Sequence, residues 1–168
     1  MSTVILRLNE SDPTVTVHAT RLKDGNPGAQ LITVTGGLTA LGRMNMGDLL
    51  FIIGHGSPTA FGGYSAANLA KLLATNDLHS GISIDLVGCK VGATGAPYAL
   101  DLKLQLVANK IVPTSVTGGT NNMQVKADGT PFTKTPGPGG TEILPGKQTV
   151  NTPWGPRTRN VNPKYGTS

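Results

Sequence analysis

Two residues of this sequence have the chemistry to form a nucleophile and its base. His55 ends the apolar run LLFIIG and is followed by Gly56, and Cys89, the only cysteine, ends the run ISIDLVG. A free thiol has a pKa of about 8.5, so it is mostly protonated at neutral pH. A neighbouring imidazole can take that proton and create an effective nucleophile for acyl transfer. The two residues predict a His55–Cys89 catalytic dyad if the fold brings them together.

The elements around these residues are expected to bring them to one edge of a sheet. Residues 48–54 and 82–87 are continuous apolar runs, which is typical of buried parallel strands. Between them we predict a helix over 65–76, with Ser65 as its N-cap. A helix of this length spans about 18 Å and returns the chain to the start of the sheet. Both strands then end at the same edge, where open α/β sheets bind their ligands.

Glycine beside the predicted dyad leaves room for a substrate. Gly56 carries no Cβ, and its N–H could donate to the oxyanion that forms during acyl transfer. The N–H of Cys89 is the second candidate donor, so we predict an oxyanion hole made by these two residues. The other histidines, His18 and His79, are interpreted as structural, with His79 as the alternative base if His55 fails.

The rest of the chain predicts an α/β three-layer sandwich with a mostly parallel central sheet. Residues 97–110 are ambiguous: LDLKLQL alternates like a strand, whereas Pro97 and the good helix formers favour a helix. We predict a helix there, because two parallel strands need a crossover. Strands are expected at 3–8, 14–19, 31–35 and 114–118, the first two forming an N-terminal β-hairpin around the turn NESDP.

Beyond residue 120 the composition changes. Residues 123–134 predict a β-hairpin around Asp128 and Gly129, and residues 136–168 are rich in Pro and Gly without periodicity, which indicates an extended arm or disorder. We therefore divide the chain into an α/β domain (1–120), a hairpin or flap (121–135) and a basic tail (136–168). Of the net charge of +5, residues 129–168 supply most, with five Lys and Arg against one acidic residue.

Length and composition exclude several classes of protein. A chain of 168 residues, 38% of them hydrophobic, is long enough for one domain with its own core. One cysteine allows no internal disulfide and is too few for a zinc cage, and no metal-ligand cluster, P-loop or dinucleotide motif is present, so we expect no metal and no cofactor. The sequence has no secretory signal pattern and no apolar run near ~20 residues. We expect a cytoplasmic protein, or one secreted by a route that needs no signal peptide, without a membrane partner.

Two other nucleophile arrangements do not fit the sequence. The elbow of an α/β-hydrolase needs Gly two residues before and two after the nucleophile, where this chain has Val87 and Val91. Its histidine also follows the nucleophile, and no histidine follows Cys89. In papain-like enzymes the cysteine precedes the histidine, which is the reverse of the order here.

The order of these motifs resembles that of the caspase-like cysteine peptidases of clan CD. The resemblance is carried by LLFIIGHG (49–56) and ISIDLVGCKVG (82–92), within a strand order that extends over 31–120. Cys89-Lys90-Val91-Gly92 is similar to the C-x-x-G of CHAT proteases, clostripain-like enzymes and the self-cleaving protease domains of bacterial toxins. The separation of 34 residues between His55 and Cys89 is shorter than the roughly 50 of caspases. The resemblance implies a caspase-hemoglobinase-like fold, His55 as catalytic histidine, Cys89 as nucleophile and Gly56 in the oxyanion hole.

The resemblance also implies a protein or peptide substrate, and a role in self-processing or as a toxin effector. Candidate substrate-binding residues are Asp85, Val116, Thr117 and Gly118. Toxin-type members are activated by an anionic inositol phosphate on a basic flap, which five residues here could imitate: Lys126, Lys134, Lys147, Arg157 and Arg159.

Two functions of other classes remain open. The first is a catalytically inactive caspase-like module that binds partners through the Pro-rich arm. The second and weaker one is nucleic-acid binding through the tail, whose charges are sparse; three aromatic residues in the hairpin and tail could stack on bases: Phe132, Trp154 and Tyr165.

Overall fold

The computed structural model describes residues 1–57, 59–88, 98–119, 122–134, 142–143, 146–152, 155–161 and 164–167. Side chains are described for 1–57, 59–88, 98–118 and 125–130. Cys89 and Pro97 lie outside the described residues.

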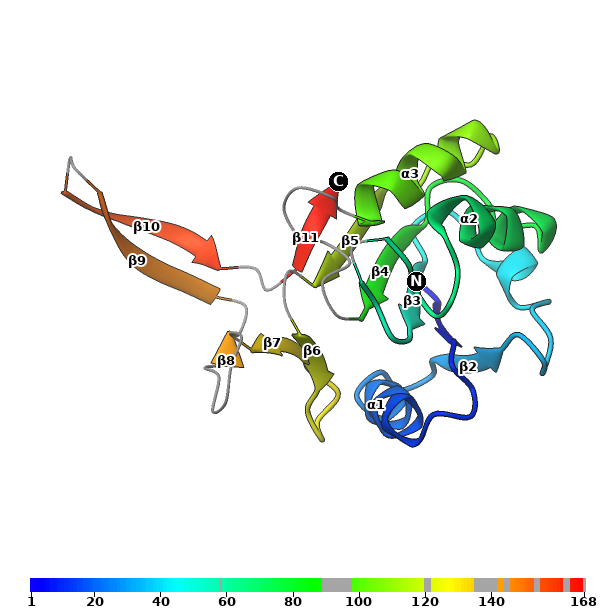
Figure 1. Ribbon diagram of the computed structural model, residues 1–168, viewed down its shortest axis with the longest axis horizontal. Coiled ribbons are helices and arrows are strands. Elements are labelled where there is room, and N and C mark those ends of the chain that lie inside the picture. The colour runs from blue at the N-terminus through cyan, green and yellow to red at the C-terminus, as the bar shows by residue number, and fades with distance from the viewer. Residues whose placement is uncertain are drawn as a thin grey trace.

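A six-stranded sheet forms the centre of the molecule (Figure 1). Five of its strands are parallel: β1 (Thr3–Arg7), β2 (Gln30–Thr33), β3 (Leu49–Ile53), β4 (Ser83–Val87) and β5 (Ser115–Gly119). β11 (Lys164–Thr167) pairs antiparallel with β5, and the strand order is β11-β5-β4-β3-β1-β2.

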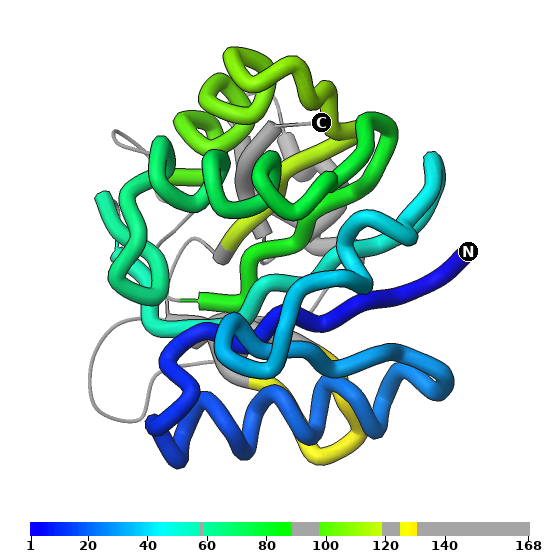
Figure 2. The backbone as a smooth tube through the Cα atoms, turned by 90° about the vertical axis from the view of Figure 1, so that its right-hand side faces the viewer, coloured from blue at the N-terminus to red at the C-terminus, as the bar shows by residue number. Residues whose placement is uncertain are grey.

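Helices cover both faces of the sheet, which confirms the predicted three-layer α/β sandwich. α1 (Pro13–Asp24) lies on one face, and α2 (Ala66–Thr75) and α3 (Tyr98–Ala108) lie on the other (Figure 2). β3 is apolar throughout because both of its faces are covered: Leu50 and Ile52 are in the core under α2 and α3, whereas Phe51 and Ile53 are in the core under α1. A short 3-10 helix, η1 (Leu41–Arg43), precedes β3. Among the described residues, no helix is long and apolar enough to cross a membrane.

The helices at 65–76 and 97–110 are confirmed as α2 and α3. Ser65 caps α2, accepting a hydrogen bond from the Asn68 N–H at 3.2 Å. α3 is the crossover between the parallel strands β4 and β5, so the need for a crossover outweighed the strand-like alternation of its sequence.

The predicted strand at 14–19, and with it the N-terminal β-hairpin, is wrong. These residues are part of α1. This helix connects β1 to β2, and the two strands are parallel to each other. Asp12 caps the helix, Pro13 occupies its first turn, and the buried side chains are spaced as on a helix: Val15, Ala19 and Leu22. The cap and the apolar face together overrode the strand preference of the alternating Thr and Val residues.

The described parts of the chain beyond residue 120 are strands. β6 (Asn122–Val125) and β7 (Pro131–Lys134) pair antiparallel around the turn at Asp128 and Gly129, where the sequence predicts a hairpin. β8 (Glu142–Ile143) pairs with β7, and β9 (Gly146–Thr152) pairs with β10 (Gly155–Val161). The segment for which the sequence indicates an extended arm or disorder supplies a hairpin and the strand β11 that flanks β5.

The β6–β7 hairpin is attached to α1. The Val125 side chain is buried in the core under this helix, its N–H donates to Nδ1 of His18 at 3.1 Å, and its carbonyl accepts from Arg21 at 3.1 Å. Gly25 and Gly129 approach so closely that a Cβ on either would overlap the other's backbone. His18 thus has the structural role that the sequence predicts for it, although on a helix.

Candidate active site

The ends of β3 and β4 lie side by side. Ile53 pairs with Val87 in register, and each is followed by a glycine, Gly54 and Gly88. The Gly54 N–H donates to the Val87 carbonyl at 3.3 Å, and a Cβ added at Gly88 would lie 2.8 Å from the Gly54 carbonyl oxygen. The residue before His55 therefore contacts the residue before Cys89.

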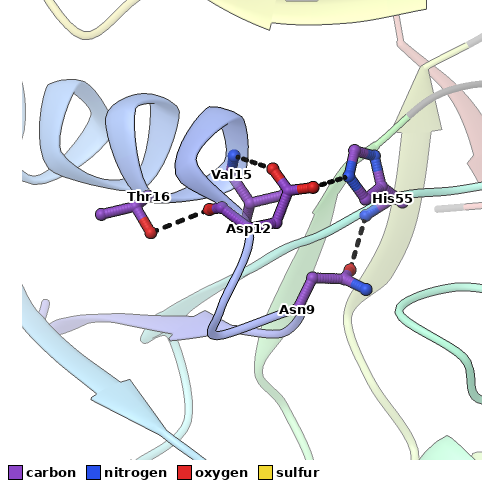
Figure 3. Close-up of polar contacts among 5 residues, drawn as sticks. All are labelled: Asn9, Asp12, Val15, Thr16 and His55. Atoms are coloured by element: carbon purple, nitrogen blue, oxygen red, sulfur yellow. Dashed lines mark hydrogen bonds and ion pairs between the residues drawn. The ribbon is translucent and has the colours of Figure 1, made fainter.

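The His55 imidazole is held by a carboxylate from α1 (Figure 3). Its Nε2 lies 2.8 Å from Oδ2 of Asp12, and the two side chains are 58% and 33% exposed. The other oxygen of Asp12, Oδ1, accepts the N–H of Val15 at 3.1 Å. One carboxylate therefore caps the helix and orients the histidine.

The same loop also holds the main chain of His55. The Asn9 Oδ1 accepts the His55 N–H at 2.9 Å (Figure 3), and Asn9 has a left-handed backbone with φ of 47°. β1 lies beside β3, and the Leu8 N–H donates to the Ile53 carbonyl at 2.8 Å. The loop after β1 is thus placed at the edge where β3 ends.

The contacts of Asp12 determine which nitrogen of His55 can act as a base. The hydrogen bond from His55 is the main cause that lowers the pKa of Asp12, and the Val15 N–H lowers it further. Asp12 is therefore an ionised acceptor, so the hydrogen of a neutral His55 ring lies on Nε2. Nδ1 then carries a lone pair and can take a proton.

Described residues after His55 are bonded to it and packed into the core. The His55 carbonyl accepts the Gly62 N–H at 2.7 Å, and Phe61 is fully buried with its ring centroid 6.0 Å from that of Tyr98. The Tyr98 hydroxyl donates to the Tyr64 carbonyl at 3.1 Å, and burial raises the pKa of Tyr98 far above its ordinary value. Within the described residues, no acceptor is bonded to the Gly56 N–H.

The candidate substrate-binding residues lie within strands. Asp85 is buried in the middle of β4, in register with Thr117 of β5. Val116 is fully buried in the core and offers no surface to a substrate, and Gly118 is buried beside Tyr165 of β11. β5 runs from Ser115 to Gly119, so the strand predicted at 114–118 is confirmed. A role of these residues in substrate binding stays a prediction.

The other candidate residues lie away from this edge or outside the described side chains. His79 is exposed between α2 and β4, at the opposite edge of the sheet from His55. Lys126 is half-buried in the β6–β7 turn, and the remaining residues of the predicted anion site are described by their backbone only: Lys134, Lys147, Arg157 and Arg159. No group of three or more His, Cys, Asp or Glu side chains suited to a metal occurs in the described part of the chain.

Sequence reasoning missed Asp12 and Asn9. The pair Asp12-Pro13 is a helix-start signal, since Asp is a preferred N-cap and Pro a preferred first residue. Recognising it would have replaced the strand at 14–19 by a helix that starts at the sheet edge. The contact of Asn9 with His55 has no such local signal, because it depends on β1 pairing with β3.

Comparison with known protein families identifies the class of enzyme to which the chain belongs. The model of the Peptidase C80 family matches residues 3–134, which extend from β1 to the end of β7. The chain belongs to the Peptidase C80 family. This is a family of cysteine peptidases of clan CD, so the chain is a cysteine peptidase and the caspase-like resemblance is confirmed. Among curated proteins, no match to this C80 peptidase is found.

Proposed function

We propose that Cys89 is the nucleophile of this peptidase, that His55 is its base, and that Asp12 orients His55. The observation that supports the proposal best is the contact between Gly54 and Gly88, because each is the residue directly before one member of the dyad. Neighbouring strands are about 4.8 Å apart, so the next residue along each chain is within reach of the other.

The proposed reaction begins with proton transfer from the Cys89 thiol to Nδ1 of His55. The thiolate forms a bond to the carbonyl carbon of the scissile peptide, and the carbonyl electron pair moves to the oxygen. The N–H groups of Gly56 and Cys89 donate to that oxyanion. The C–N bond then breaks, and the imidazolium returns its proton to the leaving amine.

Hydrolysis of the resulting thioester completes the cycle. His55 takes a proton from water while the water oxygen attacks the thioester carbon, and the C–S bond breaks to release a carboxylic acid. The imidazolium then returns the proton to the thiolate. Asp12 remains ionised throughout and stabilises the imidazolium that forms in both halves of the reaction.

We further propose that the substrate is a protein segment, the longer polypeptide of this chain included. The likeness of Cys89-Lys90-Val91-Gly92 to self-cleaving toxin domains supports this. Self-cleavage within one molecule predicts a first-order rate that does not change over a hundredfold range of protein concentration. A rate proportional to concentration, with Cys89→Ala protein cleaved equally well by added wild-type protein, would show cleavage between molecules instead.

The dyad can be tested without knowledge of the substrate by measuring how fast iodoacetamide alkylates Cys89 between pH 5 and 9. A thiol paired with His55 reacts at neutral pH faster than N-acetylcysteine, because more of it is thiolate. We expect His55→Ala to remove this acceleration and to lower casein hydrolysis by about 10²–10⁴-fold, the range for loss of a general base.

His79→Ala is the matched control, since this exposed histidine lies at the opposite edge of the sheet and its replacement should change neither rate. If wild-type protein and His55→Ala follow the same pH–rate curve for alkylation, His55 does not activate Cys89. If Cys89→Ala still hydrolyses casein, Cys89 is not the nucleophile.

A further inference from the structure

We infer that Asn9 is a positioning residue of the active site: by holding the main chain of His55, it keeps the imidazole on Asp12 and its Nδ1 in a fixed direction. The inference rests on the proposed role of His55 as the base. Asn9 is not expected to touch the substrate or the reacting atoms.

His55 needs an anchor of this kind, because packing does little to hold it. Its side chain is 58% exposed, and it follows the last residue of β3, where the strand ladder has ended. Among the described residues, its direct hydrogen bonds are three: the ring to Asp12, the carbonyl to Gly62, and the N–H to Asn9. Only the last joins the main chain of His55 to the loop that supplies Asp12.

Because His55 is exposed, the Asn9 contact is not needed merely to give the His55 N–H a hydrogen-bond partner. A buried N–H must be paired to avoid a desolvation cost. The N–H of an exposed residue can bond to water instead, so its contact with Asn9 is not required to satisfy the donor. The contact fixes the relative positions of His55 and Asp12, because it holds the main chain of His55 against residues 9–12, the loop that also supplies Asp12.

The surroundings of Asn9 are built for this contact. Its left-handed backbone, with φ of 47°, directs the side chain toward His55, and asparagine tolerates that conformation better than most residues. Gly54 permits the approach, since a Cβ there would lie 2.9 Å from Oδ1 of Asn9 and 3.1 Å from Cβ of Leu8.

The far side of the loop is fixed as well. Glu10 accepts hydrogen bonds from both the N–H and the hydroxyl of Thr35, at 3.1 Å and 2.8 Å. These bonds are the main cause that lowers the pKa of Glu10, so the carboxylate is an ionised acceptor at neutral pH. Asn9 and Asp12 therefore extend toward His55 from a loop that is itself tied to the segment after β2.

Three variants separate a positioning role from a role in the turn alone. Asn9→Gly keeps a residue that adopts positive φ but removes the acceptor, whereas Asn9→Asp keeps an acceptor of the same shape. Lys110→Gly is the control, because Lys110 also has a positive φ, 64°, but follows α3 at a distance from the site.

The main readout is the pair of ring nitrogen NMR shifts of His55 at pH 7.5, which report the tautomer. We expect the wild-type protein and the Lys110→Gly control to show the tautomer with hydrogen on Nε2. Asn9→Gly should show a mixture of the two tautomers, and Asn9→Asp should show the wild-type pattern again. In casein hydrolysis, Asn9→Gly should lower kcat about tenfold with KM unchanged, since small misplacements of a catalytic group are costly.

The inference is overturned if Asn9→Gly leaves both the ring spectrum and kcat at wild-type values, or if Asn9→Asp fails to restore the spectrum. A lower melting temperature with an unchanged ring spectrum would assign Asn9 to the turn alone. These outcomes are distinct from failure of the proposed function, because the ring spectrum reports the Asn9 and Asp12 contacts whether or not Cys89 is the nucleophile.

Discussion

Replacing Gly88 by Ala should damage both the stability and the site, because the position has no room for a methyl group. The new Cβ would overlap the ring of Phe61 and lie 2.8 Å from the Gly54 carbonyl oxygen. Neither neighbour can move freely: Phe61 is fully buried against Tyr98, and Gly54 is backbone at the end of β3.

Overpacking of this kind costs about 2 kcal/mol. For a domain of this size, 1 kcal/mol corresponds to about 2–4 °C in melting temperature, so we expect Gly88→Ala to melt about 4–8 °C below the wild type. The end of β4 must also shift away from β3, so the acceleration of Cys89 alkylation that the proposed dyad predicts at neutral pH should be reduced. Differential scanning calorimetry and the iodoacetamide assay measure the two effects.

A double mutant tests the cause. Phe61→Leu removes Cε2 of the ring, the atom that the new methyl group would overlap most, so adding Gly88→Ala to it should cost about 1 kcal/mol less than in the wild type, a coupling expected only of residues in contact. Gly42→Ala is the control, because its nearest neighbour would be Cβ of Asp77 at 3.3 Å, and we expect a change within about 0.5 kcal/mol. Strict additivity of Phe61→Leu and Gly88→Ala would refute the steric argument.

Two further predictions concern buried polar contacts. Asp48 is 5% exposed and accepts the N–H groups of Ser2 and Asn45 at 2.6 Å and 2.8 Å, which lower its pKa. Asp48→Asn should lower the free energy of unfolding, measured with urea at pH 7, by about 2 kcal/mol. The difference from the wild type should decrease as the pH falls through the lowered pKa of Asp48. An equal difference at pH 7 and pH 3 would contradict this prediction. Burial lowers the pKa of His18 in the folded protein. When the pH drops below about 6.5, the pKa of histidine in the unfolded chain, the unfolded state therefore binds a proton that the folded state does not, and the stability decreases as the pH decreases. His18→Gln should therefore lose less stability than the wild type between pH 7.5 and 5.5, as measured by urea midpoints, and an identical loss would exclude His18 as the cause.

The sequence predicted the elements whose signals are local. Continuous apolar runs identified β3 and β4 because both faces of these strands are covered, and the Ser65 cap identified the start of α2. The position of His55 at the edge followed from these elements alone, since a helix between parallel strands brings their carboxyl ends to one edge.

The residues around His55 could not be predicted in this way. Val15 and Val17 suggested a strand, yet only Val15 is buried and Val17 is 48% exposed, because the helix uses every third or fourth residue. Asn9 and Asp12 reach His55 because β1 is the neighbour of β3, and strand order across a sheet is a long-range property. Strand β11 was missed for the same reason: its partner, β5, lies about fifty residues earlier in the chain.

The double use of the Asp12 carboxylate has an electrostatic consequence. The N-terminus of a helix carries a partial positive charge, which stabilises a carboxylate at the N-cap. The negative charge of Asp12 is therefore shared between the dipole of α1 and the imidazole of His55. The dipole acts together with the hydrogen bonds from His55 and Val15 that lower the pKa of Asp12, so the carboxylate stays ionised as the pH falls. Loss of this one charge would therefore remove the cap of α1 and the partner of the His55 ring together.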